Sequence, residues 1–397
     1  MRILFLNLLL LVVSFGNAQS PKAQLNLINS ADLAVKDFYK EFNYENKFGY
    51  IIIPVEIGNE NYRYIFDTGG YNTLISAIMD KNNLPDLMQV EVGSSNQIKS
   101  TIALTKIPSV KIGGIDFNDV GALNFDFDDS PQIGCYTNGG LIGKSIIKNA
   151  VWQINKEESK IVLTNKIEEL QHLKNAIRLK VDFDRTLNPF IKIKVNGKNM
   201  KFMLDLGYGG LVSFTENSGK KLKAKDLIEI IGEGSVSANG VINESIFMNN
   251  LESLKIDDFE LKKQVGFYAK SNNYNLVGSG ILDYFIVTLN FPNNELLLYP
   301  LDSNNEEEKS SFGFDLNKND NSMYVSKLFL GQSAEQAGLK LNDQVISINN
   351  REFLEVPYCE FYDYVQKTFE ENIPIDLKIK REEKIISFKI NRKELFQ

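Results

Sequence analysis

The sequence has 397 residues, which is too long for one small hydrophobic core and predicts two or three domains. Hydrophobic residues make up 43% and charged residues 24%, a composition typical of folded proteins that excludes a disordered chain. The formal net charge of −7 argues against a nucleic-acid-binding protein, because such proteins concentrate Lys and Arg on one surface.

The chain begins with a segment typical of a secretory signal peptide. Arg2 supplies a positive charge, residues 3–15 are mostly apolar, and small residues precede Gln19. The apolar stretch is shorter than the roughly 20 residues that cross a bilayer, and no longer one follows it. We therefore expect residues 1–18 to be removed and the mature protein to be exported, periplasmic or secreted, without a membrane span.

The few Cys and His residues limit the chemistry. Cys135 and Cys359 are the only cysteines, which excludes a disulfide framework and a zinc site of several thiolates. Because they fall in different predicted domains, we expect free, partly buried thiols, and the sequence leaves a bridge between them open. The single histidine, His172, lies in a polar segment without a nucleophile turn nearby. Any hydrolytic chemistry must therefore be carried by carboxylates.

The sequence contains an internal repeat. Residues 48–69 read FGYIIIPVEIGNENYRYIFDTG, and residues 189–207 read PFIKIKVNGKNMKFMLDLG. Each copy predicts a strand, a polar tight turn and a second strand that ends at Asp-x-Gly. The two carboxylates are Asp67 and Asp205, which are 138 residues apart (205 − 67).

Each copy continues with a hydrophobic-hydrophobic-Gly segment. The first ends at Gly143, 76 residues after its aspartate (143 − 67), and the second at Gly278, 73 residues after its aspartate (278 − 205). Glycines such as Gly69 and Gly207 let another backbone approach a carboxylate closely. Gly143 and Gly278 then let a buried strand pack beside each loop. These matching spacings predict a duplicated unit rather than unrelated turns.

The motifs IFDTGG and GLIGKSII resemble the active-site loop and the following segment of retropepsin-like and pepsin-like aspartic proteases. The similarity covers roughly residues 44–301. It implies a mainly β fold with two pseudo-twofold-related acid-protease β-barrel lobes and a cleft for an extended peptide under one or two flaps. The flap candidates are residues 91–104, EVGSSNQIKSTIAL, and residues 232–247, GEGSVSANGVINESIF.

The resemblance implies that Asp67 and Asp205 form a catalytic pair that shares one proton. The charged carboxylate would act as general base on a bound water, while the protonated one polarises the peptide carbonyl. Because such a pair titrates as a unit, neither residue is assigned to one role. The substrates implied are peptides or proteins, and no metal or cofactor is required.

The second loop departs from the family pattern. A Thr or Ser follows each aspartate in the family, and its hydroxyl braces the opposite loop; Thr68 fits this pattern but Leu206 has no hydroxyl. The residues expected to support the loops are Thr68, Gly69, Leu206, Gly207, Gly143 and Gly278. Two functions therefore stay open: an active aspartic endopeptidase, or a catalytically weak or inactive protease-like protein that binds peptides as a scaffold.

The last part of the chain resembles a PDZ domain. SFGFDL is similar to the carboxylate-binding loop of that family, and YVSKLFLGQSAEQAGLKLNDQVISINNREF is similar to the strands and helix turn that follow. Residues 356–371 predict a helix that walls the peptide groove. The resemblance implies that Ser311, Phe312, Gly313 and Phe314 bind the C-terminal carboxylate of a peptide or protein partner. A unit that only packs on the protease lobes is the alternative.

The predicted organisation has six parts. They are a signal peptide (1–18), an N-terminal segment (19–43), a first protease lobe (44–168), a second lobe (169–301), an acidic linker (302–310) and an α+β PDZ domain (311–397). The length of the N-terminal segment also leaves open a protease that is activated when this segment is removed.

Overall fold

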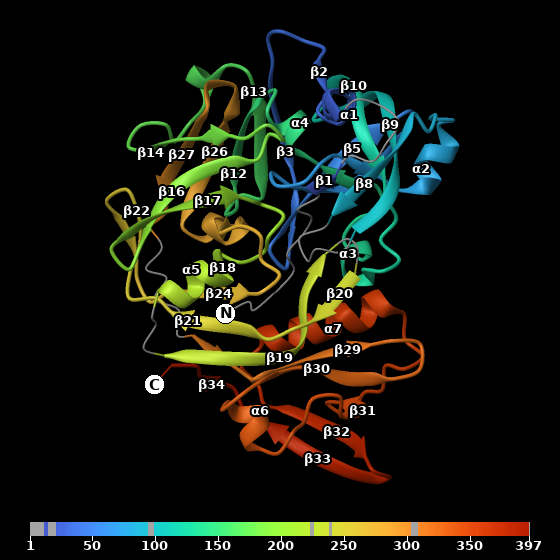
Figure 1. Cartoon of the computed structure of the whole chain (residues 1–397), viewed down its shortest axis with the longest axis vertical. Coiled ribbons are helices and arrows are strands. Elements are labelled where there is room, and N and C mark those ends of the chain that lie inside the picture. Colours follow the sequence, from blue (N-terminus) through green and yellow to red (C-terminus); the bar gives the residue numbers. More distant parts are fainter. Residues whose placement is uncertain are drawn as a thin grey trace.

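The computed structural model describes residues 12–14, 21–93, 99–222, 226–237, 240–302 and 309–396. The predicted signal peptide lies outside the described residues, apart from the short strand β1 (Val12–Ser14). The fold is mainly β, as expected, and is followed by the expected α+β PDZ unit at the C-terminal end (Figure 1).

A ten-stranded sheet carries the Asp67 unit. Strands β5 and β6 form the predicted hairpin, and β11 lies parallel to β6, with Leu141 opposite Ile65. The strands of this sheet are β1, β2 (Asp32–Leu33), β4 (Glu45–Lys47), β5 (Tyr50–Ile57), β6 (Glu60–Phe66), β7 (Thr73–Leu74), β8 (Met88–Gly93), β9 (Lys99–Ile112), β10 (Ile115–Asn124) and β11 (Gly140–Ile142). The helices of this part are α1 (Pro21–Ile28), α2 (Ser76–Lys81), α3 (Pro131–Gly134) and α4 (Lys144–Ile147).

A second, larger sheet carries the Asp205 unit in the same arrangement. Strands β16 and β17 form a hairpin, and β25 lies parallel to β17, with Leu276 opposite Met203. The strand pairing of the predicted repeat is therefore present in both copies. The strands of this part are β15 (Asp182–Phe183), β16 (Pro189–Val195), β17 (Lys198–Leu204), β18 (Val212–Thr215), β19 (Leu227–Ser237), β20 (Gly240–Asn243), β21 (Ile246–Asn250), β22 (Leu254–Ile256), β23 (Phe259–Leu261), β24 (Val265–Ala269) and β25 (Leu276–Val277), with helix α5 (Glu216–Lys221) beside them.

A six-stranded sheet joins strands from the two units. Its order is β14 (Ile177–Lys180), β27 (Glu295–Pro300), β26 (Phe285–Asn290), β12 (Val151–Asn155), β13 (Lys160–Thr164) and β3 (Tyr39–Asn43). Short 3₁₀ turns lie at η1 (Ile167–Glu169), η2 (Ser279–Asp283) and η3 (Phe291–Asn293). Because β3 pairs with β13 along its whole length, the described part of the N-terminal segment belongs to the fold.

Both predicted flap segments form hairpins in the described residues. Residues 91–104 fall on the antiparallel pair β8 and β9, and residues 94–98 lie outside the described residues. Residues 232–243 fall on the antiparallel pair β19 and β20, with residues 238–239 not described, and the segment ends in the first two residues of β21. The backbone N–H of Gly240 donates to Oγ of Ser130, just before α3.

The C-terminal unit has the strands and the long helix that the sequence predicts. The expected helix at 356–371 is α7 (Tyr358–Glu370). Its other elements are β28 (Ser310–Ser311), β29 (Phe314–Lys318), β30 (Met323–Phe329), α6 (Ser333–Gln336), β31 (Gln344–Ile348), β32 (Ile375–Arg381), β33 (Lys384–Ile390) and β34 (Lys393–Glu394).

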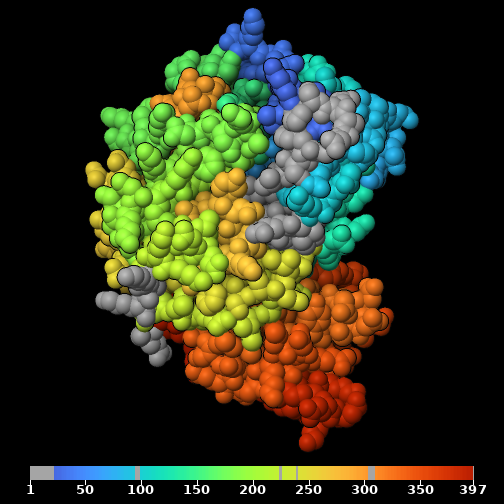
Figure 2. Space-filling model, in the orientation of Figure 1, coloured from blue at the N-terminus to red at the C-terminus, as the bar shows by residue number. Residues whose placement is uncertain are grey.

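The PDZ sheet is continuous with the sheet of the Asp205 unit. Strand β30 pairs antiparallel with β19, with Phe329 opposite Ile230. Glu233 of β19 accepts hydrogen bonds from Oη of Tyr324 at 2.7 Å and from Nδ2 of Asn317 at 2.9 Å. Figure 2 shows the orange and red surface of the PDZ unit pressed against the yellow-green surface above it. The second flap candidate therefore has its base in the PDZ sheet.

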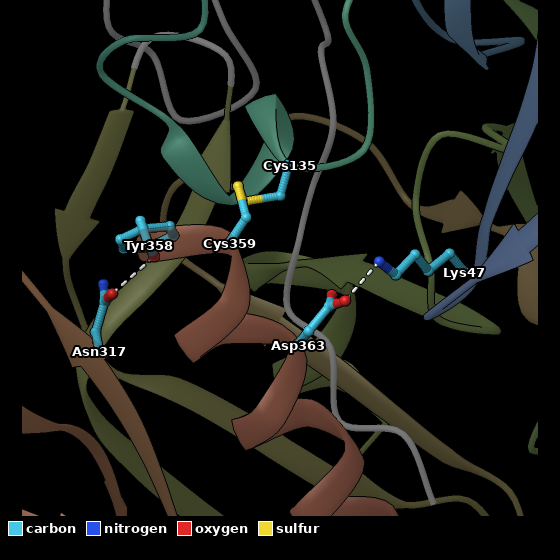
Figure 3. Close-up of a disulfide and its surroundings, with 6 residues drawn as sticks. All are labelled: Lys47, Cys135, Asn317, Tyr358, Cys359 and Asp363. Atoms are coloured by element: carbon cyan, nitrogen blue, oxygen red, sulfur yellow. Dashed lines mark hydrogen bonds and ion pairs between the residues drawn. A yellow bond between two sulfur atoms is a disulfide. The ribbon is translucent and has the colours of Figure 1, made fainter. Parts of the chain in front are cut away.

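The expectation of free thiols is wrong. Cys135, at the end of α3, and Cys359, in the first turn of α7, form a disulfide with a Cα–Cα distance of 5.3 Å. Figure 3 shows this bridge and, further along α7, Asp363 pointing toward Lys47 of β4, whose Nζ lies 2.8 Å from Oδ2 of Asp363. The docking of α7 on the first unit brings the two cysteines together, although 224 residues separate them.

Candidate active site

Asp67 is held where β6 ends. Its backbone N–H donates to the carbonyl of Ile142 in β11 at 2.9 Å, which ties the loop to the parallel strand. Its Oδ1 accepts the backbone N–H groups of Gly69, at 2.8 Å, and Gly70, at 2.9 Å. The side chain is fully buried. The tight turn thus aims two backbone donors at one carboxylate oxygen.

Asp205 occupies the matching place after β17. Its backbone N–H donates to the carbonyl of Val277 in β25 at 2.8 Å. Its Oδ1 accepts the backbone N–H of Gly207 at 3.1 Å, and the side chain is fully buried. The two copies of the repeat therefore hold their carboxylates with the same parts.

The two loops lie face to face. A β-carbon at Gly69 would lie 2.7 Å from Cγ of Asp205, and a β-carbon at Gly207 would lie 2.6 Å from Cγ of Asp67. Each carboxyl group therefore rests against the glycine of the opposite loop, where no side chain fits. The structure brings the two predicted catalytic residues into one buried site.

Gly143 and Gly278 fit closely behind the loops. A β-carbon at Gly143 would lie 2.3 Å from the carbonyl carbon of Tyr71, and one at Gly278 would lie 2.2 Å from the carbonyl oxygen of Tyr208. Because both positions lack a side chain, the chain can pass from β11 and from β25 in close contact with the backbone that follows each aspartate.

Thr68 braces the opposite loop alone. Its Oγ1 donates to the carbonyl of Leu204 at 2.6 Å and accepts the backbone N–H of Leu206 at 2.9 Å. Leu206 has no hydroxyl to return these bonds, and its side chain is buried in the main hydrophobic core. The brace between the loops is therefore one-sided, as the sequence indicates.

The electrostatics favour a shared proton. Burial raises the pKa of Asp67 to about 6, against the opposing effect of the hydrogen bonds from its loop. Burial, with the charge of Asp67, raises the pKa of Asp205 well above its ordinary range. The Oδ2 atoms of both are buried, and no donor in the described residues reaches either one. A proton held between the two carboxyls would satisfy both oxygens at once.

A buried lysine beside this site escaped the sequence analysis. Lys144, the first residue of α4, is 2% exposed, and its Nζ donates to Oδ1 of Asn188 at 2.7 Å. The signal is visible in GLIGKSII, where one charge interrupts an apolar segment that must be buried for the repeat to fold. The second copy has Ser279 at the equivalent position, so the lysine makes the two halves unequal.

The four predicted PDZ residues lie together at the start of β29. Gly313 has a φ of 81°, a conformation that favours glycine, and its N–H donates to Oγ of Ser311 at 3.1 Å. The ring of Phe369, in α7, lies 5.8 Å from that of Phe312 and 5.2 Å from that of Phe314. The loop thus turns at a left-handed glycine and packs against an aromatic ring of α7.

The free edge of β29 is covered by its own side chains. The N–H of Leu316 donates to Oδ1 of Asp315 at 2.9 Å, and that of Lys318 to Oδ1 of Asn317 at 2.8 Å. Oη of Tyr358, in α7, also donates to Oδ1 of Asn317, at 2.8 Å (Figure 3). A peptide that adds a strand at this edge must displace these acceptors.

The described part of the chain contains neither a metal-binding cluster nor a membrane-spanning helix. Within it, no group of three or more His, Cys, Asp or Glu side chains could hold a metal ion. No helix in the same ranges is both long and apolar enough to cross a membrane.

Comparison with protein families identifies two domains. Residues 53–146 match the family described as aspartyl protease, and residues 302–380 match the PDZ domain. The chain therefore carries an aspartyl protease domain and a PDZ domain, as the motifs predict. The first match includes the Asp67 loop and Gly143, whereas Asp205 lies beyond it.

Solved structures supply two further similarities. A retropepsin-like aspartic protease from Rickettsia conorii is 20% identical over 31% of this chain and 88% of that chain, with a TM-score of 0.24. Basic 7S globulin from soybean is 8% identical over 66% of this chain and 95% of that chain, with a TM-score of 0.39. None of the curated proteins compared with the chain matches it.

Proposed function

We propose that the protein is an aspartic endopeptidase that hydrolyses peptide bonds through a water held between Asp67 and Asp205. One observation carries the proposal: two fully buried carboxyl groups, each against the glycine of the opposite loop, with both pKa values raised. Such a pair holds one proton over a wide pH range, so a base and an acid are present together.

The chemistry needs only these two side chains and water. The ionised carboxylate takes a proton from the water as its oxygen attacks the peptide carbonyl carbon. The protonated carboxyl donates a hydrogen bond to the carbonyl oxygen, which gains charge in the tetrahedral intermediate. The intermediate collapses as a proton reaches the leaving nitrogen. The backbone N–H groups of Gly69 and Gly70 keep Asp67 oriented during these steps.

Cleavage of denatured casein and of a peptide library tests this proposal. We expect the folded wild-type protein to cleave between acidic and neutral pH, and Asp67→Asn and Asp205→Asn each to abolish cleavage. Asp258→Asn, which changes an exposed aspartate outside the site, is the matched control and should cleave at the wild-type rate. Full activity in either dyad variant would remove the mechanism.

A catalytically weak or inactive peptide-binding scaffold is the second candidate, and Leu206 favours it. Without a return bond from Leu206, the loop of Asp67 is held by one fewer contact between the two loops. A displacement of 1 Å within the dyad costs on the order of 100-fold in rate. Binding of library peptides without any cleavage by the folded wild type would support the scaffold and exclude the peptidase.

We propose that the PDZ loop at residues 311–314 binds the free C-terminus of a peptide or protein. The positive φ of Gly313 supports this role, because glycine permits the tight backbone turn of such a loop. The N–H of Gly313 donates to Oγ of Ser311, and a bound carboxylate would take the place of that hydroxyl as acceptor. Peptides with a free C-terminus should bind more tightly than the same peptides with an amidated end. Equal binding of both forms leaves the PDZ unit with a packing role only.

The hairpins β8–β9 and β19–β20 are proposed as flaps, and the mature protein as an exported one. The proposed protein is thus an exported enzyme with a cleaved signal peptide, in which two protease lobes carry the dyad and the two flaps cover it. N-terminal sequencing of protein recovered outside the cytoplasm should give Gln19 as the first residue. Recovery of the intact chain from the cytoplasm alone would contradict export.

A further inference from the structure

Lys144 is a buried basic residue near the dyad that the proposed mechanism does not use. Its Nζ donates to Oδ1 of Asn188 at 2.7 Å and lies 3.8 Å from the centre of the Tyr71 ring. The same atom lies 3.5 Å from the carbonyl oxygen of Gly69, in the loop whose N–H groups hold Asp67. The ammonium is therefore fixed by three contacts at the back of the Asp67 loop.

Lys144 has no direct carboxylate partner within the described ranges. On the Asn188 side, Nδ2 of Asn188 donates to Oδ2 of Asp184 at 3.0 Å. A buried charge without an ion pair is costly, so a lysine in this position needs a compensating negative charge. Burial lowers the pKa of Lys144 to about 8, while Asp184, Asp67 and Asp205 act in the opposite direction. The carboxylates of Asp184 and of the dyad are thus the negative charges that stabilise the charged form of Lys144.

The charged and titratable groups around the dyad come from several elements. Tyr50 of β5 and Tyr208 after β17 face the pair, and burial raises the pKa of both, so they stay neutral. Lys144 is the cation whose charge lowers the pKa of Asp67 among the described residues. Tyr71, against which its ammonium rests, also has a pKa raised by burial. Lys144 therefore supplies the positive charge of this environment.

We infer that Lys144 is a positioning residue that holds the dyad in its singly ionised state, with the negative charge on Asp67. Nζ of Lys144 contacts the first loop at the carbonyl of Gly69, and the second copy has Ser279 at the equivalent position. Its backbone N–H also donates to the carbonyl of Gly70 at 3.0 Å, so main chain and ammonium fix the same turn. Asp67 is then the base and Asp205 the acid. This inference rests on the proposed function, because it assigns roles within the same site.

Titration of isotope-labelled Asp carboxyl carbons in the full-length protein tests the inference directly. Asp67→Asn and Asp205→Asn assign the two dyad signals. In Lys144→Met, we expect the first ionisation of the dyad to shift upward by about one pH unit or more, because the cation that favours it is gone. Lys144→Arg should return the titration toward that of the wild type. Lys144→Gln, which keeps a donor for Asn188, replaces Lys144→Met if that variant does not fold.

Lys148→Met is the matched control. Lys148 lies on the same segment, but its Nζ lies over the ring of Phe183, 4.0 Å from the ring centre, in place of the Asp67 loop. Its loss should leave the dyad signals unmoved. Where cleavage is measurable, the acidic side of the pH profile of kcat/KM should shift upward in Lys144→Met together with the carboxyl signals. At a pH on the acidic side of the wild-type profile, Lys144→Met should therefore be about tenfold less active than the wild type.

Two outcomes separate the possible failures. A folded Lys144→Met with unchanged dyad titration overturns the inference, since a merely structural lysine alters stability without moving the carboxyl signals. An absence of cleavage in the wild type, with the predicted shift present, instead rejects the proposed hydrolysis and leaves the role of Lys144 intact.

Discussion

Thr68 holds the backbone of Leu206 in a bond that Leu206 does not return. Oγ1 of Thr68 accepts the N–H of Leu206 at 2.9 Å and donates to the carbonyl of Leu204 at 2.6 Å. The first loop therefore positions the second, and the second contributes no side-chain bond to the first. The side-chain brace between the two loops therefore depends on the hydroxyl of Thr68.

Replacing Leu206 with threonine should test whether a second brace improves the site. We expect Leu206→Thr to keep or raise kcat/KM, because the new hydroxyl can bond across to the first loop. The protein should lose about 1–3 kcal/mol of unfolding free energy, since Leu206 is fully buried in the core. Peptide cleavage and thermal unfolding measure the two effects. A sharp loss of activity in the folded variant would reveal a role of Leu206 that the structure does not explain.

Removing the existing brace should have the opposite effect. Thr68→Val leaves the carbonyl of Leu204 and the N–H of Leu206 without partners in a buried site, at a cost of about 1–3 kcal/mol each. We expect kcat/KM to fall by roughly 10- to 100-fold, because the second loop is released. Thr68→Ser keeps the hydroxyl and serves as the control. Equal activity in Thr68→Val and Thr68→Ser would show that the bond is dispensable.

The disulfide between Cys135 and Cys359 should stabilise the docked PDZ unit. Closing a loop with a sequence separation of 224 residues restricts the unfolded chain, which gives a stabilisation of about 2–5 kcal/mol. Cys135→Ser, Cys359→Ser and the double variant should unfold at the same lower temperature. Reducing agent should lower the melting temperature of the wild type alone. A melting temperature that reducing agent leaves unchanged would contradict the bridge.

The dyad should make stability fall as pH rises from about 4 to 6. Both carboxyls have raised pKa values in the folded protein, so the native state binds more protons than the unfolded chain in this range. Denaturant unfolding at a series of pH values should show this loss in the wild type and not in the double variant of Asp67→Asn with Asp205→Asn. Parallel curves for the two proteins would mean that the carboxyls are not desolvated.

Lys144 should produce the reverse dependence at alkaline pH. Its pKa is lowered to about 8 by burial, so above that pH the native state binds fewer protons than the unfolded chain. Its contribution to stability therefore rises between about pH 8 and 10. Lys144→Gln should remove this rise, which the same unfolding series measures.

The sequence was sufficient for the features that depend on local pattern. The hairpins before Asp67 and Asp205 follow from alternating apolar residues around polar turns, and the glycines after them follow from the need for close backbone approach. Helix α7 follows from apolar residues at helical spacing. Each of these depends on residues near one another in the chain, and the duplication supplied a second, matching copy.

The features that the sequence did not reveal depend on contacts across domains. The bridge of Cys135 with Cys359 requires α7 to dock on the first unit, which no local pattern encodes. The pairing of β30 with β19 and the covering of the β29 edge by Asn317 likewise arise from docking. Lys144 was visible as a charge in an apolar segment, but its partner Asn188 belongs to the other half of the repeat.

Hydrolysis of a peptide library in water enriched in heavy oxygen tests the central claim most directly. If a water held by the two aspartates is the nucleophile, mass spectrometry will find one heavy oxygen in each newly formed C-terminus. That product will be missing from Asp67→Asn and from Asp205→Asn. Wild-type cleavage that persists in either variant, or a folded wild type that cleaves nothing in the library, would contradict the account.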